Sequence, residues 1–538
     1  MTKIAFPTRG FVGGALCLSA LLAPIAGAQT VGEADALSLF ASRGEALERP
    51  VGVLRSRSID VDLELLSAED AVVLELGEDL TVLAMRDRAR SARAGSRAWL
   101  GEVAGSPNGD VRLVRRGNAL VGTVRANGQL YRVRPDAEGH HLLELVDETL
   151  LPGCAGDPSA SDAFGDASGS GGGSTTSGTT DVAAVEIDML VVYTPTARIV
   201  SGGTNGVLAL IELAALETNQ AFANSGVDTA VRVVHTAELT GYAESSSFST
   251  ELSRLRLPAD GYMDEIHALR DLYGADQVTL IVGNESSCGI AYVQDTPASW
   301  FEQLAFSVVS RNCATGYYSF AHELGHNLGC QHDQANAGNG AYSFSYGHRS
   351  SGNQWRTIMS YAPGMRIQHF SSPSIEYSGE ATGVAEGGVN PADNAETIRL
   401  LASAMAGFRA RPVEAYGEGK LSSLGAYPQA EWIGAPSATG TGFQLRMMDG
   451  VPGQGGVVHY SSTPAQDSFM GGTLLASLPL ARLTAFRVGA DGTVTVDVPV
   501  DVADVGLTRY YQFLFRDPGQ PSGPGVAMSN GVRARFLP

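Results

Sequence analysis

The sequence predicts an α/β (α+β) central domain with a mainly parallel, twisted sheet, flanked by β-rich regions on both sides. Between residues 182 and 410, strand-like and helix-like segments alternate, which is typical of a parallel sheet covered by helices. On either side of it, alternating apolar and polar residues are separated by turn sequences, which favours antiparallel strands. A stretch rich in Gly, Ser, Thr and Asp, residues 154–181, separates the first region from the central one.

The first 28 residues have the features of a secretory signal peptide. Lys3 and Arg9 precede an apolar run from Phe11 to Leu22, and residues 26–28 read Ala-Gly-Ala, a small-residue cleavage pattern. No later apolar stretch is long enough to span a bilayer. We therefore expect a soluble protein that is secreted to the extracellular space and has no transmembrane segment.

The net charge and the hydrophobic content of the chain exclude several classes of protein. The formal net charge is −20, and it becomes more negative once Lys3 and Arg9 leave with the signal peptide. Such an acidic chain is a poor candidate for binding nucleic acid or anionic membranes. Hydrophobic residues make up 44% of the chain, which excludes a mostly disordered protein. No calcium-binding repeats are present, so a structural Ca²⁺ ion has no support, and no feature indicates an oligomeric state.

The region of residues 29–153 is predicted to be rich in antiparallel strands. Residues 123–126 and 129–133 alternate in character on either side of Asn127-Gly128. Asn-Gly supplies the positive φ angles of a two-residue hairpin turn, so these segments are expected to pair. The sequence Pro-Asn-Gly-Asp at residues 107–110 indicates a second turn of this kind.

Within the central domain, the expected elements follow from periodicity. A long helix should bury Leu208, Ile211, Ala215 and Phe222 on one face and end at Gly226. A helix at residues 263–273 and a closing amphipathic helix with Ile398, Leu401 and Met405 are also expected. Buried strands are expected at residues 185–193, 231–234 and 277–282.

The last region, residues 411–538, is predicted to be a β-sandwich-like module. Val494, Val496 and Val498 alternate with polar residues, and a similar alternation at residues 511–515 precedes the turn at residues 517–519. Attachment to a surface or substrate and a purely stabilising role are both compatible with this pattern.

The chemistry of the chain is concentrated in residues 322–333, His-Glu-Leu-Gly-His-Asn-Leu-Gly-Cys-Gln-His-Asp. His322 and His326 are one helical turn apart, so both imidazoles project from one face of a helix and can share one ion. Gly329 can adopt the left-handed conformation that ends the helix and brings His332 back to the same ion. Three imidazoles and one open position are the pattern of a catalytic Zn²⁺ site. Glu323 is placed to reach a water at that position.

The spacing H-E-x-x-H-x-x-G-x-x-H resembles the metzincin clan of zinc endopeptidases, across residues 182–410. Asp333, directly after the third histidine, resembles the adamalysin (reprolysin-like) branch, here in a secreted bacterial type. Met359, in the sequence Trp-Arg-Thr-Ile-Met-Ser-Tyr, matches the Met-turn that packs beneath the three histidines. The resemblance implies one catalytic Zn²⁺ and protein or peptide substrates.

Two further features have two interpretations each, and a third has one. Tyr361 matches a tyrosine of astacin-like metzincins that helps to stabilise the oxyanion, although adamalysins generally lack it; the alternative is an aromatic residue of the cleft wall. Residues 288–293 correspond to the edge strand that pairs with the substrate backbone, or else form an ordinary buried strand. Residues 362–370 would form the wall of the pocket for the side chain just beyond the scissile bond.

Four cysteines remain after export of the chain, and they allow three disulfide connectivities. Cys288 and Cys313 bracket two short strand-like segments before the zinc helix, and we favour a disulfide between them. Cys154 lies at the end of the N-terminal region. Its thiolate could fill the open zinc position, as in the cysteine switch of related proteases. The alternative is that Cys154 forms a disulfide bond, and Cys330 is one candidate partner.

The sequence thus predicts a secreted zinc metalloendopeptidase made as a zymogen. Residues 29–153 would be its prodomain and residues 154–181 an activation linker open to proteolysis. Glu323 would act as the general base for a water that attacks the peptide bond. The alternative is an exported binding protein or adhesin whose metzincin domain has decayed, but the intact Glu323 disfavours it.

Overall fold

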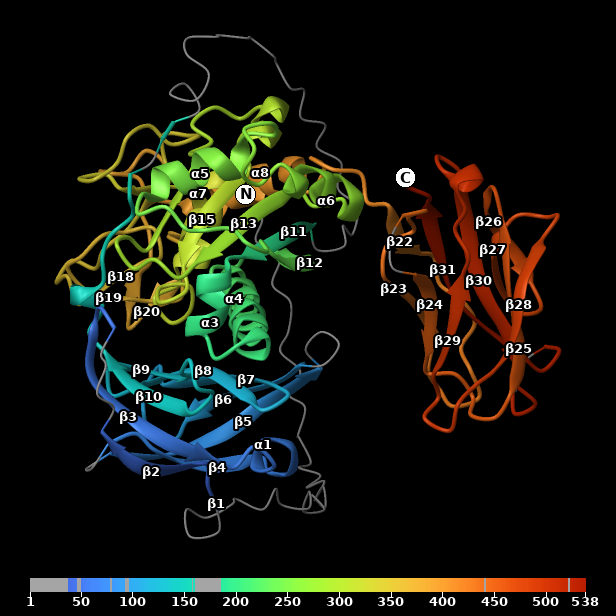
Figure 1. The fold of residues 1–538 in the computed structure, drawn as a ribbon, viewed down its shortest axis with the longest axis horizontal. Coiled ribbons are helices and arrows are strands. Elements are labelled where there is room, and N and C mark those ends of the chain that lie inside the picture. Colours follow the sequence, from blue (N-terminus) through green and yellow to red (C-terminus); the bar gives the residue numbers. More distant parts are fainter. Residues whose placement is uncertain are drawn as a thin grey trace, which may run out of the picture.

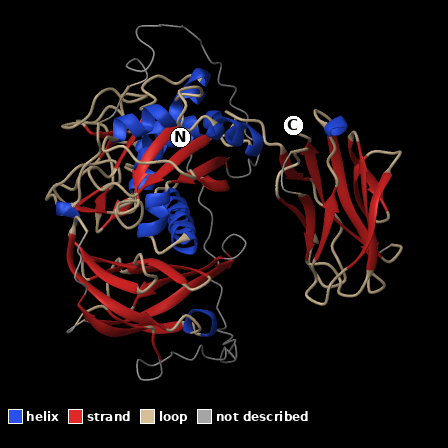
Figure 2. Ribbon diagram, viewed as in Figure 1, coloured by secondary structure: helices blue, strands red, loops and turns tan. Residues whose placement is uncertain are grey.

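A computed structural model of the chain describes residues 37–45, 50–77, 80–91, 96–156, 158–159, 185–439, 442–520 and 523–538. The expected signal peptide and nearly all of the expected linker lie outside these residues. The described residues form an N-terminal sheet, a central unit of helices and strands, and a C-terminal unit built of strands (Figure 2). None of the described helices is both long enough and apolar enough to cross a membrane.

The N-terminal unit is a ten-stranded sheet with the order β1-β4-β5-β6-β7-β8-β9-β10-β3-β2. Its neighbouring strands are antiparallel except for β1 and β4. The sheet surrounds its own apolar core, and β2 and β4 lie below β8 and β9 in Figure 1. The strands are β1 (Leu37–Ser38), β2 (Phe40–Glu45), β3 (Val53–Val61), β4 (Ala71–Glu75), β5 (Thr81–Ser91), β6 (Ser96–Val103), β7 (Asp110–Arg116), β8 (Ala119–Ala126), β9 (Gln129–Pro135) and β10 (His141–Val146), with the short helix α1 (Leu65–Ala68).

The expected hairpin is present between β8 and β9. Asn127 and Gly128 have φ angles of 52° and 75°, the left-handed conformations that an Asn-Gly turn requires. The second expected turn, which contains Asn108, joins β6 to β7. Both hairpins are therefore confirmed.

The central sheet has the order β12-β11-β13-β15-β14. The first four strands are parallel, and β14 is antiparallel to β15 at the edge, so the predicted mainly parallel sheet is confirmed. The elements are β11 (Val185–Tyr193), α3 (Pro195–Val200), α4 (Thr204–Asn224), β12 (Thr229–Glu238), α5 (Phe248–Arg256), α6 (Glu265–Tyr273), β13 (Gln277–Val282), β14 (Gly289–Ala291), η2 (Ser299–Leu304), β15 (Phe306–Ser310), α7 (Ser319–Asn327) and α8 (Asn394–Met405).

Helix α4 links the central sheet to the N-terminal sheet. It contacts β12 and α7 on one side and β7 and β8 on the other, and it lies between the two sheets in Figure 1. The buried carboxylate of Glu217, in α4, accepts hydrogen bonds from Thr123 Oγ1 of β8 (2.7 Å) and from the Gly316 amide (2.8 Å). Burial raises the pKa of Glu217 to about 7. The contact between the two units is therefore polar as well as buried.

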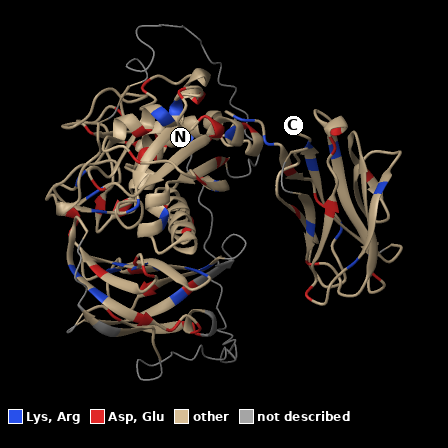
Figure 3. Ribbon diagram, in the orientation of Figure 1, with Lys and Arg blue, Asp and Glu red and all other residues tan. Residues whose placement is uncertain are grey.

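Charged residues of the N-terminal sheet take part in this contact. Figure 3 shows arginines and acidic residues mixed along its strands. Arg132 and Arg134 both bond to the buried carboxylate of Glu144 at distances of 2.6–3.0 Å. Burial alone would raise the pKa of Glu144, but the two guanidinium groups lower it to about 2. Arg132 also donates to the carbonyl of Asn312 in the central unit.

The C-terminal unit consists of a five-stranded sheet, β22-β31-β30-β25-β28, a three-stranded sheet, β23-β24-β29, and the hairpin β26-β27. Residues of the two larger sheets share one apolar core, which includes Leu445 and Phe513. The strands are β22 (Val413–Tyr416), β23 (Gln429–Ile433), β24 (Phe443–Met448), β25 (Gly455–Ser461), β26 (Pro464–Phe469), β27 (Gly472–Ala476), β28 (Ala481–Arg487), β29 (Val494–Val498), β30 (Thr508–Arg516) and β31 (Val526–Arg535).

The Cys288–Cys313 disulfide forms and closes a loop with a sequence separation of 25 residues. We expect the double variant Cys288→Ala/Cys313→Ala to lose about 3 kcal/mol of unfolding free energy, because an unbridged loop gains conformational freedom on unfolding. Urea denaturation measures the loss. Cys330→Ala, which removes a buried sulfur outside any described disulfide, is the matched control. Equal midpoints for the double variant and the wild type would contradict this expectation.

Candidate active site

Three buried imidazoles converge at the end of α7. His322 and His326 come from α7, and His332 comes from β16 (Gln331–Asp333). The Nε2 atom of His332 is 3.1 Å from Nε2 of His322 and 3.2 Å from Nε2 of His326. Nitrogen atoms that each lie about 2.0–2.1 Å from one zinc ion are separated from one another by comparable distances. The structure therefore brings together the three residues that the sequence selected as metal ligands.

Backbone carbonyls orient two of these rings. The Nδ1–H group of His322 donates to the Ile358 carbonyl (2.8 Å), and that of His326 donates to the Cys330 carbonyl (3.0 Å). These bonds leave the Nε2 lone pairs directed at the common centre, as in known metal-ligating histidines. Burial, followed by the nearby His326, lowers the pKa of His322 well below its usual range. The neutral imidazole that a metal requires is thus the favoured form.

The helix ends where the sequence places its stop. Gly329 has a φ of 80°, which returns the chain toward the metal ligands. A Cβ atom at this position would lie 2.7 Å from both Ala341 Cβ and Leu401 Cδ1. Glycine is therefore required for conformation and for space.

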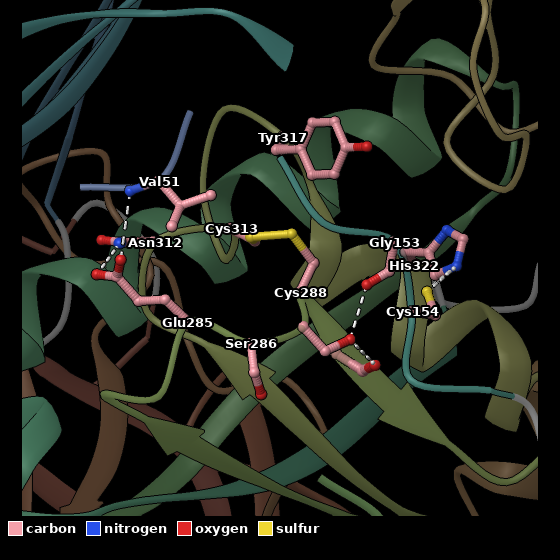
Figure 4. The surroundings of a disulfide bond; sticks show 12 residues. Val51, Gly153, Cys154, Glu285, Ser286, Cys288, Asn312, Cys313, Tyr317 and His322 are labelled. Atoms are coloured by element: carbon pink, nitrogen blue, oxygen red, sulfur yellow. Dashed lines mark hydrogen bonds between the residues drawn. A yellow bond between two sulfur atoms is a disulfide. The ribbon is translucent and has the colours of Figure 1, made fainter. Parts of the chain in front are cut away.

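Cys154 lies at the fourth corner of the histidine cluster. Its Sγ atom is 3.1 Å from His322 Nε2 (Figure 4). The same atom is 3.4 Å from Glu323 Oε1. The ligand atoms of Cys154 and the three histidines all lie within 4.8 Å of one another. Three imidazoles and one thiol are the nitrogen and sulfur donors that tetrahedral zinc takes, so the residues present fit this ion.

Cys330, the other described cysteine outside the disulfide, is buried and does not bond to Cys154. The alternative disulfide from Cys154 to Cys330 is absent, since neither residue takes part in a disulfide in the part of the chain that the structure describes. Cys330 is fully buried, with its Sγ atom 3.7 Å from the Asn394 carbonyl. Burial raises the pKa of the Cys330 thiol well above its usual range. Cys330 is therefore an inert residue of the core.

Glu323 lies against the backbone of the edge strand. Its side chain is fully buried, and a Cβ atom built on Gly289 of β14 would be 2.3 Å from Glu323 Oε1. Gly289 therefore makes room for the carboxylate. Gly289 does not stand out as a site residue in the sequence, although a glycine within a strand often marks a close approach of this kind.

The Met-turn packs beneath the zinc helix. Met359 is fully buried, and its Sδ atom is 2.6 Å from the point that a Cβ on Gly325 would occupy. Glycine at position 325, inside the His-Glu-Leu-Gly-His motif, is what allows the thioether to approach the helix. Met359 thus lies where the family resemblance implies.

Asp333 joins the third histidine to the Met-turn. Its carboxylate accepts from the amide of Tyr361 (3.0 Å) and pairs with Arg349 (2.5 Å). The ring of Tyr361 packs on that of His332, with 4.0 Å between the centroids. Asp333 and Tyr361 therefore fix the position of the His332 imidazole.

The outer edge of β14 is occupied by the chain itself. The Gly153 carbonyl accepts from the Cys288 amide (3.0 Å), and the Ala155 amide donates to the Gly289 carbonyl (2.9 Å). Further along, Ser159 forms a parallel bridge with Val293. The expected edge strand is present, and it is buried, with residues 153–156 and 158–159 lying along its edge.

We expect Gly289→Ala to lower peptide hydrolysis by about 10²-fold, the loss that a displacement of roughly 1 Å of a reacting group produces. The added methyl group would meet Glu323 Oε1 and force the carboxylate to move. Peptidase rates and metal content of the processed variant provide the measurement. Gly407→Ala is the control, because Gly407 also lacks a positive φ and a Cβ built there comes no closer than 3.6 Å to another atom. An unchanged rate for Gly289→Ala would contradict the placement of Glu323.

Comparison with known proteins agrees with this site. A family description for metallopeptidases of family M12, of the reprolysin type, matches residues 183–371. Over 360 residues the chain is 36% identical to a peptidyl-Asp metalloendopeptidase of Stenotrophomonas maltophilia (strain R551-3), covering 61% of this chain and 81% of the relative. It is 35% identical over 360 residues to a peptidyl-Asp metalloendopeptidase of Xanthomonas campestris pv. campestris, covering 64% and 82%. The chain belongs to this family of M12 metallopeptidases, and it is a metzincin-like zinc metalloendopeptidase.

Proposed function

We propose that the chain is a secreted endopeptidase, made as a zymogen, that hydrolyses peptide bonds in extended polypeptides. The observation that carries the proposal is the convergence of His322, His326 and His332 beside Glu323, with the chain's own Cys154 at the remaining corner. The sequence features of a signal peptide at residues 1–28 support secretion.

The side chains divide the reaction between them. Zn²⁺ held by the three histidines supplies a Lewis acid that polarises the scissile carbonyl and acidifies water. Glu323 accepts a proton from the attacking water, whose oxygen bonds to the carbonyl carbon. As the carbon–nitrogen bond breaks, Glu323 passes that proton to the leaving amine. Tyr361 is held beside His332. Its hydroxyl group donates a hydrogen bond to the carbonyl oxygen of the substrate as negative charge develops there.

The N-terminal unit acts as an inhibitory prodomain. Cys154 occupies the place beside Glu323 that water needs, and residues 153–156 and 158–159 take the edge of β14 that an extended substrate would use. The N-terminal sheet also holds the loop before α7, because Arg125 donates to the Gly316 carbonyl (2.7 Å) and to Tyr318 Oη (3.0 Å). Cleavage within residues 154–181 would allow the whole inhibitory unit to leave.

The substrate class follows from the relatives. Both are named peptidyl-Asp metalloendopeptidases, and we extend that preference for aspartyl bonds to this chain. The alternative of a binding protein with a decayed catalytic domain is disfavoured, since the three histidines and Glu323 are all present and assembled. Chelator-sensitive hydrolysis of casein by the processed protein distinguishes the two.

We expect Glu323→Ala to reduce hydrolysis by at least about 10²-fold, the contribution typical of a general base, with metal content still near one ion per chain. Peptidase assays and metal analysis of the processed variant measure the two effects. Glu265→Ala, at an exposed position in α6, should leave both unchanged. Full activity of the Glu323 variant would refute its role as the base.

We expect Cys154→Ser to raise the activity of the unprocessed chain at least about tenfold, the factor that corresponds to ~1.4 kcal/mol, because a hydroxyl is a much weaker zinc ligand than a thiolate. A small fluorogenic peptide reports the initial rate, and electrophoresis verifies that the chain is intact. Cys330→Ala should keep the low activity of the wild-type precursor. A Cys154 variant as inactive as the wild type would rule out the switch.

A further inference from the structure

Two buried arginines lie side by side next to the turn that follows Met359. Arg356, in β18 (Trp355–Arg356), and Arg366, in β19 (Met365–Arg366), are register partners and are 1% and 2% exposed. Neither guanidinium forms an ion pair with a carboxylate among the residues that the structure describes. Burial, followed by the neighbouring Arg366, lowers the pKa of Arg356 to about 10. Two adjacent buried cations that form no ion pair are costly, which points to a role beyond packing.

The two guanidinium groups differ in how well they are satisfied. Arg356 donates to the carbonyls of Gly364 (2.8 Å) and Ser360 (2.7 Å) and to Tyr317 Oη (3.3 Å), so it supports the turn that follows Met359. Arg366 donates from Nη1 to the Tyr317 carbonyl (2.9 Å), whereas its Nε atom is buried without a hydrogen-bond partner. The Nε–H group of Arg366 can therefore donate a hydrogen bond to a ligand.

This arginine pair lies next to the metal ligands. The ring of Tyr317, two residues before α7, has the Arg366 guanidinium carbon 4.0 Å and that of Arg356 5.4 Å from its centroid. The Ser360 carbonyl, which accepts from Arg356, is two residues beyond the Ile358 carbonyl that orients His322. Arg366 also belongs to residues 362–370, the expected wall of the pocket for the side chain beyond the scissile bond.

One carboxylate approaches the pair, and it comes from the N-terminal unit. Glu148, in η1 (Glu148–Leu150), accepts from the Arg366 amide (2.9 Å) and pairs with Arg125 (2.5 Å). Its negative charge also acts on Arg356, in the direction that raises the pKa of that guanidinium. Glu148 is six residues before Cys154, so a single segment places a carboxylate beside the arginines and a thiol beside the histidines.

We propose that Arg356 and Arg366 form the subsite that binds the acidic side chain of the substrate residue just beyond the scissile bond, with Glu148 taking the place of that carboxylate in the unprocessed chain. This inference rests on the proposed function. A guanidinium presents parallel donors that match a carboxylate, and Arg366 supplies the direct contact while Arg356 adds charge and holds the turn. A neutral side chain in the same place would leave the buried cations without an anion. The ratio of kcat/KM for a substrate with aspartate over one with asparagine should therefore be large.

The test compares processed wild type with Arg366→Gln on two fluorogenic peptides that differ only in Asp or Asn at the residue beyond the scissile bond. We expect the ratio of kcat/KM for Asp over Asn to fall by about 10- to 100-fold in the variant, the range for loss of a charged hydrogen bond. Hydrolysis of the Asn peptide should stay within about threefold of the wild type. Product mass spectrometry verifies the position of the cleaved bond.

Two further variants make the comparison specific. Arg366→Lys keeps the charge but not the paired donors, so its Asp-over-Asn ratio should lie between those of the wild type and Arg366→Gln. If the glutamine variant does not fold, the lysine variant tests the arginine subsite in its place. Arg270→Gln is the matched control, because Arg270 is also 1% exposed and bonded to backbone carbonyls, those of Ala275, Glu302 and Asp276. The Arg270 variant should keep the wild-type ratio even where its stability falls.

The outcomes separate this inference from the proposed function. A wild-type enzyme that cleaves both peptides equally well, or an Asp-over-Asn ratio unaffected in both Arg366 variants, would overturn the arginine subsite and leave the endopeptidase standing. Absence of any chelator-sensitive hydrolysis by the processed wild type would overturn both.

Discussion

The structure depends on the convergence of three buried imidazoles on one point. Two of them are fixed by a single helical turn, and the third arrives only because Gly329 adopts a positive φ and lets the chain fold back. The surroundings serve that geometry, since the Ile358 and Cys330 carbonyls set the ring orientations and Met359 fills the space below Gly325. Neutral rings held close together in a dry interior are a favourable arrangement only when a cation joins them.

The segment before the central domain covers the groups that the proposed function assigns to the attacking water and to the substrate. Its backbone pairs with β14, the Cys154 thiol lies between His322 and Glu323, and the Glu148 carboxylate lies beside Arg366. Each contact uses a group that would otherwise serve the substrate. Anchoring by Arg125 and Arg132 adds buried polar bonds that extend from the N-terminal sheet to the loop before the zinc helix. Inhibition and recognition would then draw on the same surface, and removal of one segment would switch between them.

Local patterns predicted the parts of the fold that local chemistry determines. The motif around His322, the stop at Gly329, the Asn127-Gly128 hairpin and the Cys288–Cys313 disulfide follow from residue spacing or turn chemistry. Helix α5 was missed, since only three of its nine residues, Phe248, Leu252 and Leu255, are apolar and they give a weak periodic pattern. Gly289, Arg366 and Glu148 could not be identified, because their importance arises from contacts between segments far apart in the chain. The same reason explains why the covered edge of β14 was not foreseen.

The proposed inhibition requires that Cys154 completes the coordination of one metal ion by the three histidines in the unprocessed chain. Absorption spectroscopy of the cobalt-substituted full chain tests it directly, because a thiolate ligand gives a sulfur-to-cobalt charge-transfer band that imidazoles do not. We expect one cobalt ion per chain with this band, and loss of the band after cleavage of the linker and removal of the N-terminal unit. One bound cobalt ion with no sulfur band in the full chain, or no stoichiometric metal at all, would contradict it.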